Sequence, residues 1–236
     1  MSRSRDVDAG KSPRSPQVST DPVVLRRNIE RALKRDDSPA EVLPMLERLQ
    51  RVALEGSDDA SYADRRMAEL LLETAPWRAA LHIRRLVESE PLEDATWALM
   101  GLAQALLGHY RYACASYRRA LAIAPGNPWY SHNLGHLLDV ALDRPRDARK
   151  HLERAHARVP DEPAITCSLV HALWRAGDLD QARRILRPLL ITANGTDPDV
   201  TALAAELDRE PTGSGERAPL GGPRAKRRRR ASTSRR

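Results

Sequence analysis

Three imidazoles and one carboxylate in the second half of the chain are spaced so that they could act together. His132, His136 and Asp139 stand at i, i+4 and i+7, which places them on one face of a helix. His171 falls on the equivalent strip of a neighbouring segment, and such a set could bind zinc or supply a general base. The residues between the first two histidines lack the glutamate of an HExxH zinc site. We therefore favour a polar binding surface over a metal or catalytic site.

Other catalytic arrangements are not found in the sequence. Cys167 and His171 share a helix face, but neither a phosphate-binding G-x4-GK-[ST] segment nor a G-x-S-x-G nucleophile turn occurs. The two cysteines, Cys114 and Cys167, support neither a disulfide framework nor a cysteine-rich zinc site. The sequence therefore predicts a protein that is not an enzyme and that holds no cofactor or metal.

The C-terminal segment RAKRRRRASTSRR is a second candidate site. A run of five basic side chains can bind nucleic acid, an acidic protein or anionic lipid by charge alone. The segment has no aromatic residue, so it offers no platform on which bases could stack. The alternative is an end of the chain that only improves solubility. The five residues are Lys226, Arg227, Arg228, Arg229 and Arg230.

The basic charge of the chain is concentrated at its ends. The 236 residues include 39 Lys and Arg against 32 Asp and Glu, but residues 21–207 hold 25 basic and 27 acidic side chains. Both ends are rich in Ser, Pro, Gly and Arg, which predicts disorder over residues 1–20 and 210–236. No run approaches the roughly 18 apolar residues of a membrane span. The stretch MSRSRDVDAGKSPRSP has no apolar core, so we expect no secretory signal and a cytoplasmic location.

The elements that must position these side chains belong to an internal repeat. Three segments beginning at Asp94, Pro128 and Pro163 align with spacings of 34 and 35 residues, and each reads as two helices. The second unit is one residue longer than the first, and we expect this extra residue in the turn near 143–145. Gly101 is expected where the two helices of its unit come closest, as is the matching glycine of the second unit.

The repeat resembles the tetratricopeptide repeat, whose pattern is W-x2-L-G-x2-Y, A-x3-F, A and P. The third unit departs from this pattern with Val170 in place of Gly and Leu189 in place of the last Ala. The first unit matches at Trp97, Met100, Gly101, Gly108, Tyr110, Ala113, Tyr117, Ala120 and Pro125. The later units match at Leu134, Gly135, Ala148, Leu152, Ala155 and Pro160, and at Leu169, Gly177, Ala182 and Leu186.

The resemblance implies an all-α, right-handed α-solenoid of helix–turn–helix repeats over residues 58–209. An N-terminal helical pair over 21–57 would precede it, and either cap the solenoid or dimerise. Asp21 and Pro22 supply the cap and first-turn signals of this pair. Within the solenoid we expect a degenerate repeat at 60–93, repeats at 94–127, 128–162 and 163–196, and a cap helix at 197–209.

The resemblance also implies a binding groove on the concave face, which the first helix of each unit lines. Only one residue fits the clamp by which some members hold a C-terminal carboxylate, so we do not expect that ligand. The predicted function is a non-catalytic scaffold for a peptide or helix of a partner protein. The alternatives are a nucleic-acid-associated protein tethered by its tail and a chaperone for secreted substrates. The main candidate groove residues are Trp129, His132, Asn133, His136, Asp139, Ser168, His171, Trp174 and Arg175. The same positions also include Ala95, Ala98, Leu99, Leu102 and Ala105 of the first repeat, Val140, Ala164 and Cys167 of the later repeats, and Ser61, Asp64, Arg65, Ala68 and Leu71 of the degenerate repeat.

Overall fold

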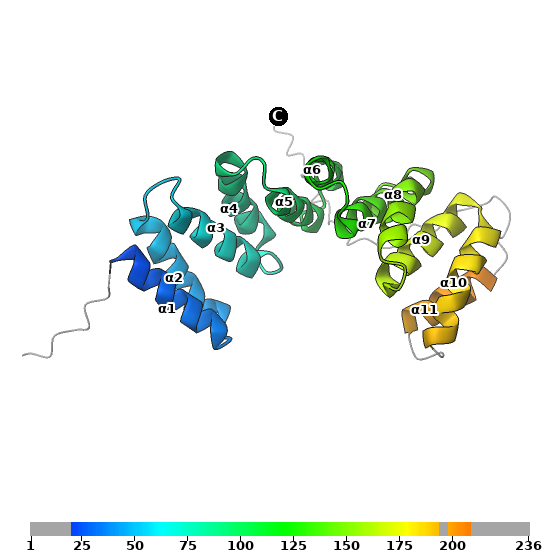
Figure 1. Ribbon diagram of the computed structural model, residues 1–236, viewed down its shortest axis with the longest axis horizontal. Helices are drawn as coiled ribbons and strands as arrows, with labels where there is room; N and C mark the ends of the chain where they lie inside the picture. Colours follow the sequence, from blue (N-terminus) through cyan, green and yellow to red (C-terminus); the bar gives the residue numbers. More distant parts are fainter. Residues whose placement is uncertain (1–19, 194–197, 209–236) are drawn as a thin grey trace, which may run out of the picture.

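The computed structural model describes residues 20–193 and 198–208, and these form helices joined by short turns without any strand. The helices follow one another along an arch, with each successive pair packed on the previous one (Figure 1). The predicted tails and the residues 226–230 lie outside the described ranges. The helices are α1 (Pro22–Lys34), α2 (Pro39–Val52), α3 (Asp58–Leu71), α4 (Pro76–Ser89), α5 (Asp94–Leu106), α6 (Tyr110–Ile123), α7 (Pro128–His136), the π-helical turn η1 (Leu137–Ala141), α8 (Pro145–Arg158), α9 (Pro163–Ala176), α10 (Leu179–Ala193) and α11 (Pro198–Asp208).

Local signals in the sequence set many of the helix ends. The Asp21 carboxylate accepts a hydrogen bond from the backbone N–H of Val23 at 2.9 Å and so caps α1. Asn127 caps α7 in the same way. Gly108 and Gly177, after α5 and α9, have φ values of 75° and 89°. This left-handed conformation costs glycine little, so both residues end a helix cheaply and let the chain reverse.

The N-terminal pair α1–α2 continues the solenoid. Its apolar faces bury Leu25 and Ile29 of α1 and Leu46 of α2 in the same hydrophobic cluster as side chains of α3 and α4. Arg26 also bonds to Asp59 at 3.0 Å, which connects α1 to α3. Most of the apolar side chains of the two helices are therefore used within the chain, as in a cap, while Val23 at the start of α1 stays 61% exposed.

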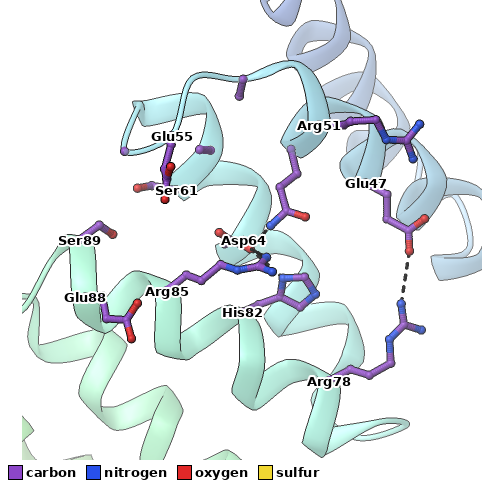
Figure 2. Close-up of a pocket in the computed structure, with 14 residues that line it drawn as sticks. Glu47, Arg51, Glu55, Ser61, Asp64, Arg78, His82, Arg85, Glu88 and Ser89 are labelled. Atoms are coloured by element: carbon purple, nitrogen blue, oxygen red, sulfur yellow. Dashed lines mark hydrogen bonds and ion pairs between the residues drawn. The ribbon is translucent and has the colours of Figure 1, made fainter.

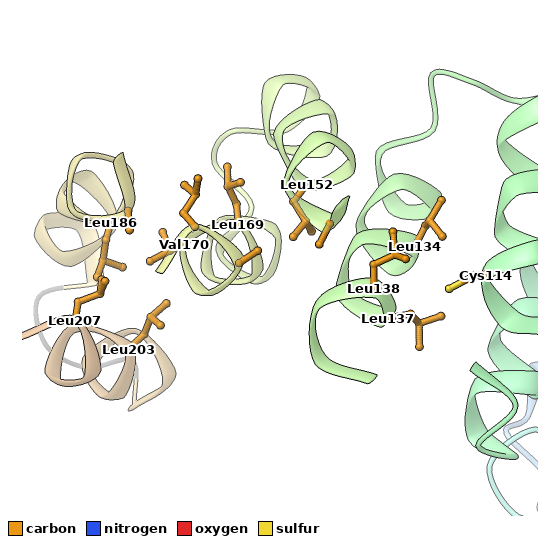
Figure 3. Close-up of a cluster of buried hydrophobic side chains, with 14 of the residues drawn as sticks. Cys114, Leu134, Leu137, Leu138, Leu152, Leu169, Val170, Leu186, Leu203 and Leu207 are labelled. Carbon is orange, nitrogen blue, oxygen red and sulfur yellow. The ribbon is translucent and has the colours of Figure 1, made fainter. Parts of the chain in front are cut away.

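A second hydrophobic cluster holds the C-terminal half together. It begins at Cys114 on α6, passes through Leu134 and Leu152, and ends at Leu203 and Leu207 on α11 (Figure 3). Helix α11 therefore covers the apolar side of the last repeat, which a solenoid needs because its final repeat has no further neighbour. Of the described helices, none is long and apolar enough to cross a bilayer.

The glycines at the helix crossings leave no room for a side chain. A Cβ atom at Gly101 would lie 2.9 Å from the ring of Tyr117, and one at Gly135 would lie 2.6 Å from Cγ of Leu152. The facing Ala148 is fully buried as well. The expectation that small residues mark the closest approach of the two helices is confirmed at both positions.

The surplus residue of the second repeat lies within a helix, so its expected place in the turn near 143–145 is wrong. The backbone N–H of Leu142 donates to the carbonyl of Leu137 at 3.0 Å, an i to i−5 bond that makes η1 a π-helical turn. Asp143, with φ of 55°, then takes the left-handed position that glycine holds in the flanking repeats. A π turn absorbs one residue without lengthening the loop, which explains how a 35-residue repeat stacks on 34-residue neighbours.

Candidate partner-binding surface

Four large apolar side chains are exposed on α5 and η1 and at the start of α7. Leu102 and Leu106 are 40% and 50% exposed, Trp129 is 46% exposed and Val140 is 50% exposed. Leu106 and Val140 occupy the same position in successive repeats. These helices follow the inner side of the arch (Figure 1). We call the four residues the apolar strip. Leu106 was not among the groove residues predicted from the sequence, although it stands one helical turn after Leu102.

An aromatic row on α7 borders the apolar strip. The ring centroids of Trp129 and His132 lie 6.1 Å apart, and those of His132 and His136 lie 6.0 Å apart. Nε2 of His132 lies 2.9 Å from Oγ of Ser168, which links α7 to α9. Burial lowers the pKa of His132, so its ring is neutral at pH 7. Trp129 and His136 remain exposed at the two ends of the row.

Three of the predicted groove residues bond to one another. Asp139 is buried, and its Oδ2 lies 2.5 Å from Nδ1 of His171. Nη1 of Arg175 donates to Oδ1 of Asp139 at 2.8 Å and to its backbone carbonyl at 2.5 Å. The same guanidinium bonds to Asp143. We call these four residues the inter-repeat cluster, because it ties the π turn of one repeat to α9 of the next.

The two remaining predicted residues also have partners inside the chain. Asn133 donates from Nδ2 to the hydroxyl of Tyr117 at 3.3 Å, which joins α7 to α6. Trp174 packs against the C-terminal hydrophobic cluster, with its ring 5.8 Å from that of His171. The structure therefore brings all nine predicted residues together on α7, η1 and α9, and Trp129 is the more exposed of the two tryptophans. Their role in partner binding stays a prediction.

The degenerate repeat does not extend the open surface as expected. Asp64, Ala68 and Leu71 of α3 are buried, because α3 packs between α2 and α4. Oδ1 of Asp64 accepts from Nε2 of Gln50 at 2.5 Å and lies 2.7 Å from Nδ1 of His82. The prediction that these three α3 residues line the groove is therefore wrong.

The groups around Asp64 line a cavity of about 770 Å³ between α2, α3 and α4 (Figure 2). Nη1 of Arg85 also donates a hydrogen bond to Oδ1 of Asp64, at 3.2 Å. Nη2 of Arg78 donates to Oε1 of Glu47 at 3.3 Å, and both residues line the same cavity. The buried carboxylate is thus neutralised by donors from two other helices. Such an arrangement holds α2 and α4 on either side of α3. Within the described ranges, no three His, Cys, Asp or Glu side chains are placed to hold a metal ion.

Comparison with known proteins identifies similar sequences and folds. Residues 139–207 match the tetratricopeptide repeat family. The structure of MamA from Desulfovibrio magneticus RS-1, residues 41 to the end, is 18% identical, covers 79% of this chain and 97% of that chain, and superposes with a TM-score of 0.64. PilW, a widely conserved type IV pilus biogenesis factor, is 20% identical, with coverage of 64% and 70% and a TM-score of 0.56.

A third similar structure is a thermophilic tetratricopeptide repeat protein of Thermus thermophilus, TTC0263. It is 18% identical, covers 79% of this chain and 98% of that chain, and has a TM-score of 0.54. At such identities the likeness concerns the fold alone. No curated protein sequence matches the chain.

Proposed function

Because this chain is built from tetratricopeptide repeats, as the sequence predicted, we propose that it is a non-catalytic scaffold that binds a helix or peptide of a partner protein. The observation that carries the proposal is the apolar strip. Leu102, Leu106, Trp129 and Val140 lie on successive first helices and are all at least 40% exposed. Apolar side chains gathered on one face of a repeat protein lower their free energy when a partner covers them.

The charge of the inner helices indicates what kind of segment fits. Helix α5 carries one charged residue, Asp94, and α7 carries no Asp, Glu, Lys or Arg. Long-range attraction to a charged peptide is therefore weak on this surface. The partner segment that fits best is apolar on one side, such as an amphipathic helix whose leucine-like side chains lie along the apolar strip.

Trp129 is the side chain expected to contribute most to this binding. A tryptophan that is half exposed in the free protein and covered in a complex is the residue type that most often dominates an interface. Its backbone N–H is bonded to Asn127 at 3.0 Å, and its ring contacts His132. The backbone bond fixes the start of α7, and the edge-on contact with His132 favours one orientation of the indole ring before binding.

Replacing Trp129 with Ala is expected to weaken partner binding by about 30-fold, which corresponds to a loss of about 2 kcal/mol. A photo-crosslinking amino acid at position 136 in the expressed chain would first identify the partner. The affinity of the purified partner for the Trp129→Ala variant would then be measured by calorimetry. Circular dichroism should show unchanged helix content.

The matched control is Trp77→Ala. Trp77 is 60% exposed on α4, away from the apolar strip, so its removal deletes an equally large exposed side chain. Binding should be unchanged in this variant. Equal losses in the two variants, or crosslinks to the same partner from position 77, would contradict the assignment of the binding surface.

A further inference from the structure

The second helices of the repeats differ in charge from the first helices. Helix α6 carries three arginines and no acidic residue, and α8 carries five basic and two acidic residues. The inner helices α5 and α7 carry one acidic residue and no Lys or Arg between them. In Figure 1, α6 and α8 lie along the outer side of the arch. The outer side of this part of the solenoid is therefore basic.

Of the eight cations on α6 and α8, all except Arg149 are exposed and carry no ion pair among the described residues. Three of these seven are Arg118 on α6 and Lys150 and Arg154 on α8, where the latter two are one helical turn apart. We call these three residues the basic strip. Elsewhere on the protein, arginines such as Arg65 and Arg26 bond to carboxylates of other helices. Side chains without an internal carboxylate partner remain available to an external anion.

The acidic groups of α8 do not neutralise the basic strip. Asp147 accepts a hydrogen bond from Nε of Arg144 at 2.6 Å, and Glu153 accepts one from Nε of Arg149 at 2.7 Å. Arg149 also bonds to Asp178 at 2.9 Å, toward the next repeat. Each carboxylate of α8 is therefore already engaged by an arginine outside the basic strip.

His151 lies on α8 among the three cations of the basic strip. Its Nδ1 is buried and has no hydrogen-bond partner in the described part of the chain. Burial, followed by the charges of Lys150, Arg154 and Arg118, lowers the pKa of His151 to about 4. The imidazole is therefore neutral at pH 7.

We propose that the basic strip binds the phosphate backbone of nucleic acid, in addition to the protein partner of the inner surface. Its cations are spread over two helices on an exposed outer face, which suits an extended chain of repeated charges. Guanidinium groups pair with phosphate oxygens in a bidentate manner. Helix α8, which carries two of the three cations, has no exposed large hydrophobic side chain, whereas α6 exposes Tyr110, Tyr112 and Ile123. Charge alone is enough for nucleic acid, whereas protein interfaces usually add apolar contacts.

The position of His151 leads to a pH-dependent prediction. Its pKa is near 6.5 in the unfolded chain and about 4 in the folded protein. Protonation therefore favours the unfolded state, and stability is lost as pH falls from about 6.5 to about 4. The His151→Gln variant should not show this part of the decrease in the free energy of unfolding at low pH. Urea unfolding followed by circular dichroism at pH 7, 5.5 and 4.5 would measure the difference, with His109→Gln as an exposed control.

The same histidine reports on the basic strip. In a variant with Arg118, Lys150 and Arg154 all changed to Gln, the loss of three neighbouring charges should raise the pKa of His151, as followed by NMR titration of its ring protons. A wild-type minus His151→Gln stability difference that does not change with pH would contradict the described environment of this residue.

The proposal is tested by the binding of a labelled 20-base-pair DNA duplex to the full-length chain. In the Arg118→Gln, Lys150→Gln, Arg154→Gln variant, the affinity at 0.1 M salt should fall at least about tenfold. The plot of log K against log salt has a negative slope, and its magnitude should become smaller by about two to three. The reason is that each lost phosphate contact reduces the magnitude of the slope by about 0.9. The melting temperature should not fall, since the variant removes repulsion between like charges.

The matched control changes Arg27, Arg31 and Lys34 to Gln. These residues are exposed on α1 and have the same composition and charge as the basic strip. The α1 variant should leave the slope of log K against log salt nearly unchanged. A separate variant with Gln at 226–230 measures how much the C-terminal basic run contributes to DNA binding. Equal effects of the α1 and basic-strip variants, or no effect of the latter, would overturn the proposal. Tighter binding of poly-glutamate than of the duplex would indicate an acidic protein ligand instead, and would overturn it as well.

Discussion

Replacing Arg175 with Ala is expected to lower the free energy of unfolding by about 3 kcal/mol. The guanidinium bonds to the carboxylate and the backbone carbonyl of Asp139, and it also bonds to Asp143. The Asp139 side chain is only 2% exposed. Removing Arg175 leaves this carboxylate buried with the ring nitrogen of His171 as a remaining hydrogen-bond partner. The cost of burying a charge without an ion-pair partner exceeds that of losing a surface ion pair. Chemical denaturation followed by circular dichroism would measure the change.

Two further variants separate this effect from a general loss of charge. Arg184→Ala on α10 removes an exposed arginine whose only described hydrogen bond is to a backbone carbonyl of its own helix, and should change stability by less than about 0.5 kcal/mol. Adding Asp139→Asn to the Arg175→Ala variant removes the buried charge and should recover part of the loss. A loss below about 1 kcal/mol for Arg175→Ala would show that the inter-repeat cluster does not hold the two repeats together.

Arg175 supports the inner surface as well as lining it. Because Arg175 stabilises the contact between α9 and the π turn, its removal changes the scaffold as well as the surface. A loss of binding in Arg175→Ala would therefore not identify a contact residue. Trp129, whose side chain is 46% exposed and outside the hydrophobic clusters, is the better probe.

Replacing Gly135 with Ala is expected to destabilise the protein by about 2 kcal/mol. The new Cβ would lie 2.6 Å from Cγ of Leu152 and 3.3 Å from the backbone oxygen of Ala148. Leu152 is fully buried, so that α7 and α8 must move apart, at a cost of up to about 3 kcal/mol. The better helix propensity of Ala offsets about 1 kcal/mol of this cost. The steric overlap therefore outweighs the gain in helix propensity, and the measured midpoint of urea unfolding should fall.

Gly126→Ala is the matched control for this substitution. A Cβ at Gly126 would have Arg158 as its nearest neighbour, at an ordinary contact distance of 3.7 Å. Its stability should stay within about 0.5 kcal/mol of the wild type. In a double-mutant cycle, Leu152→Ala should remove most of the additional cost of Gly135→Ala, because the obstructing atoms are gone. Additive losses would place the cause outside this helix crossing.

The two surfaces described above lie on opposite sides of the same helix pairs. The first helices present the apolar strip, and the second helices present the basic strip. Binding at one surface does not require atoms of the other, so a partner protein and a nucleic acid could be held at once. The Trp129→Ala variant and the basic-strip variant are therefore expected to affect their own ligands independently.

The sequence by itself determined the fold class, the 34-residue period and the positions of the small residues at the helix crossings. These features depend on local and periodic signals. Asp21 and Asn127 cap helices through bonds to residues two or three positions away, and Gly108 and Gly177 end helices through their own backbone conformation. The resemblance to tetratricopeptide repeats rests on the same signals, and it is confirmed.

Only the tertiary structure decided which polar groups are open to a partner and which are used between helices. Arg175 and Asp139 are 36 residues apart, and they meet where α9 lies against the π turn of the preceding repeat. Asp64 looked like a surface residue in the sequence, yet donors from α2 and α4 enclose it. The rotation of one helix against the next is set by the packing of the whole layer of side chains. A repeat pattern places a residue on a helix, but that rotation determines whether its side chain faces a partner or a neighbouring helix.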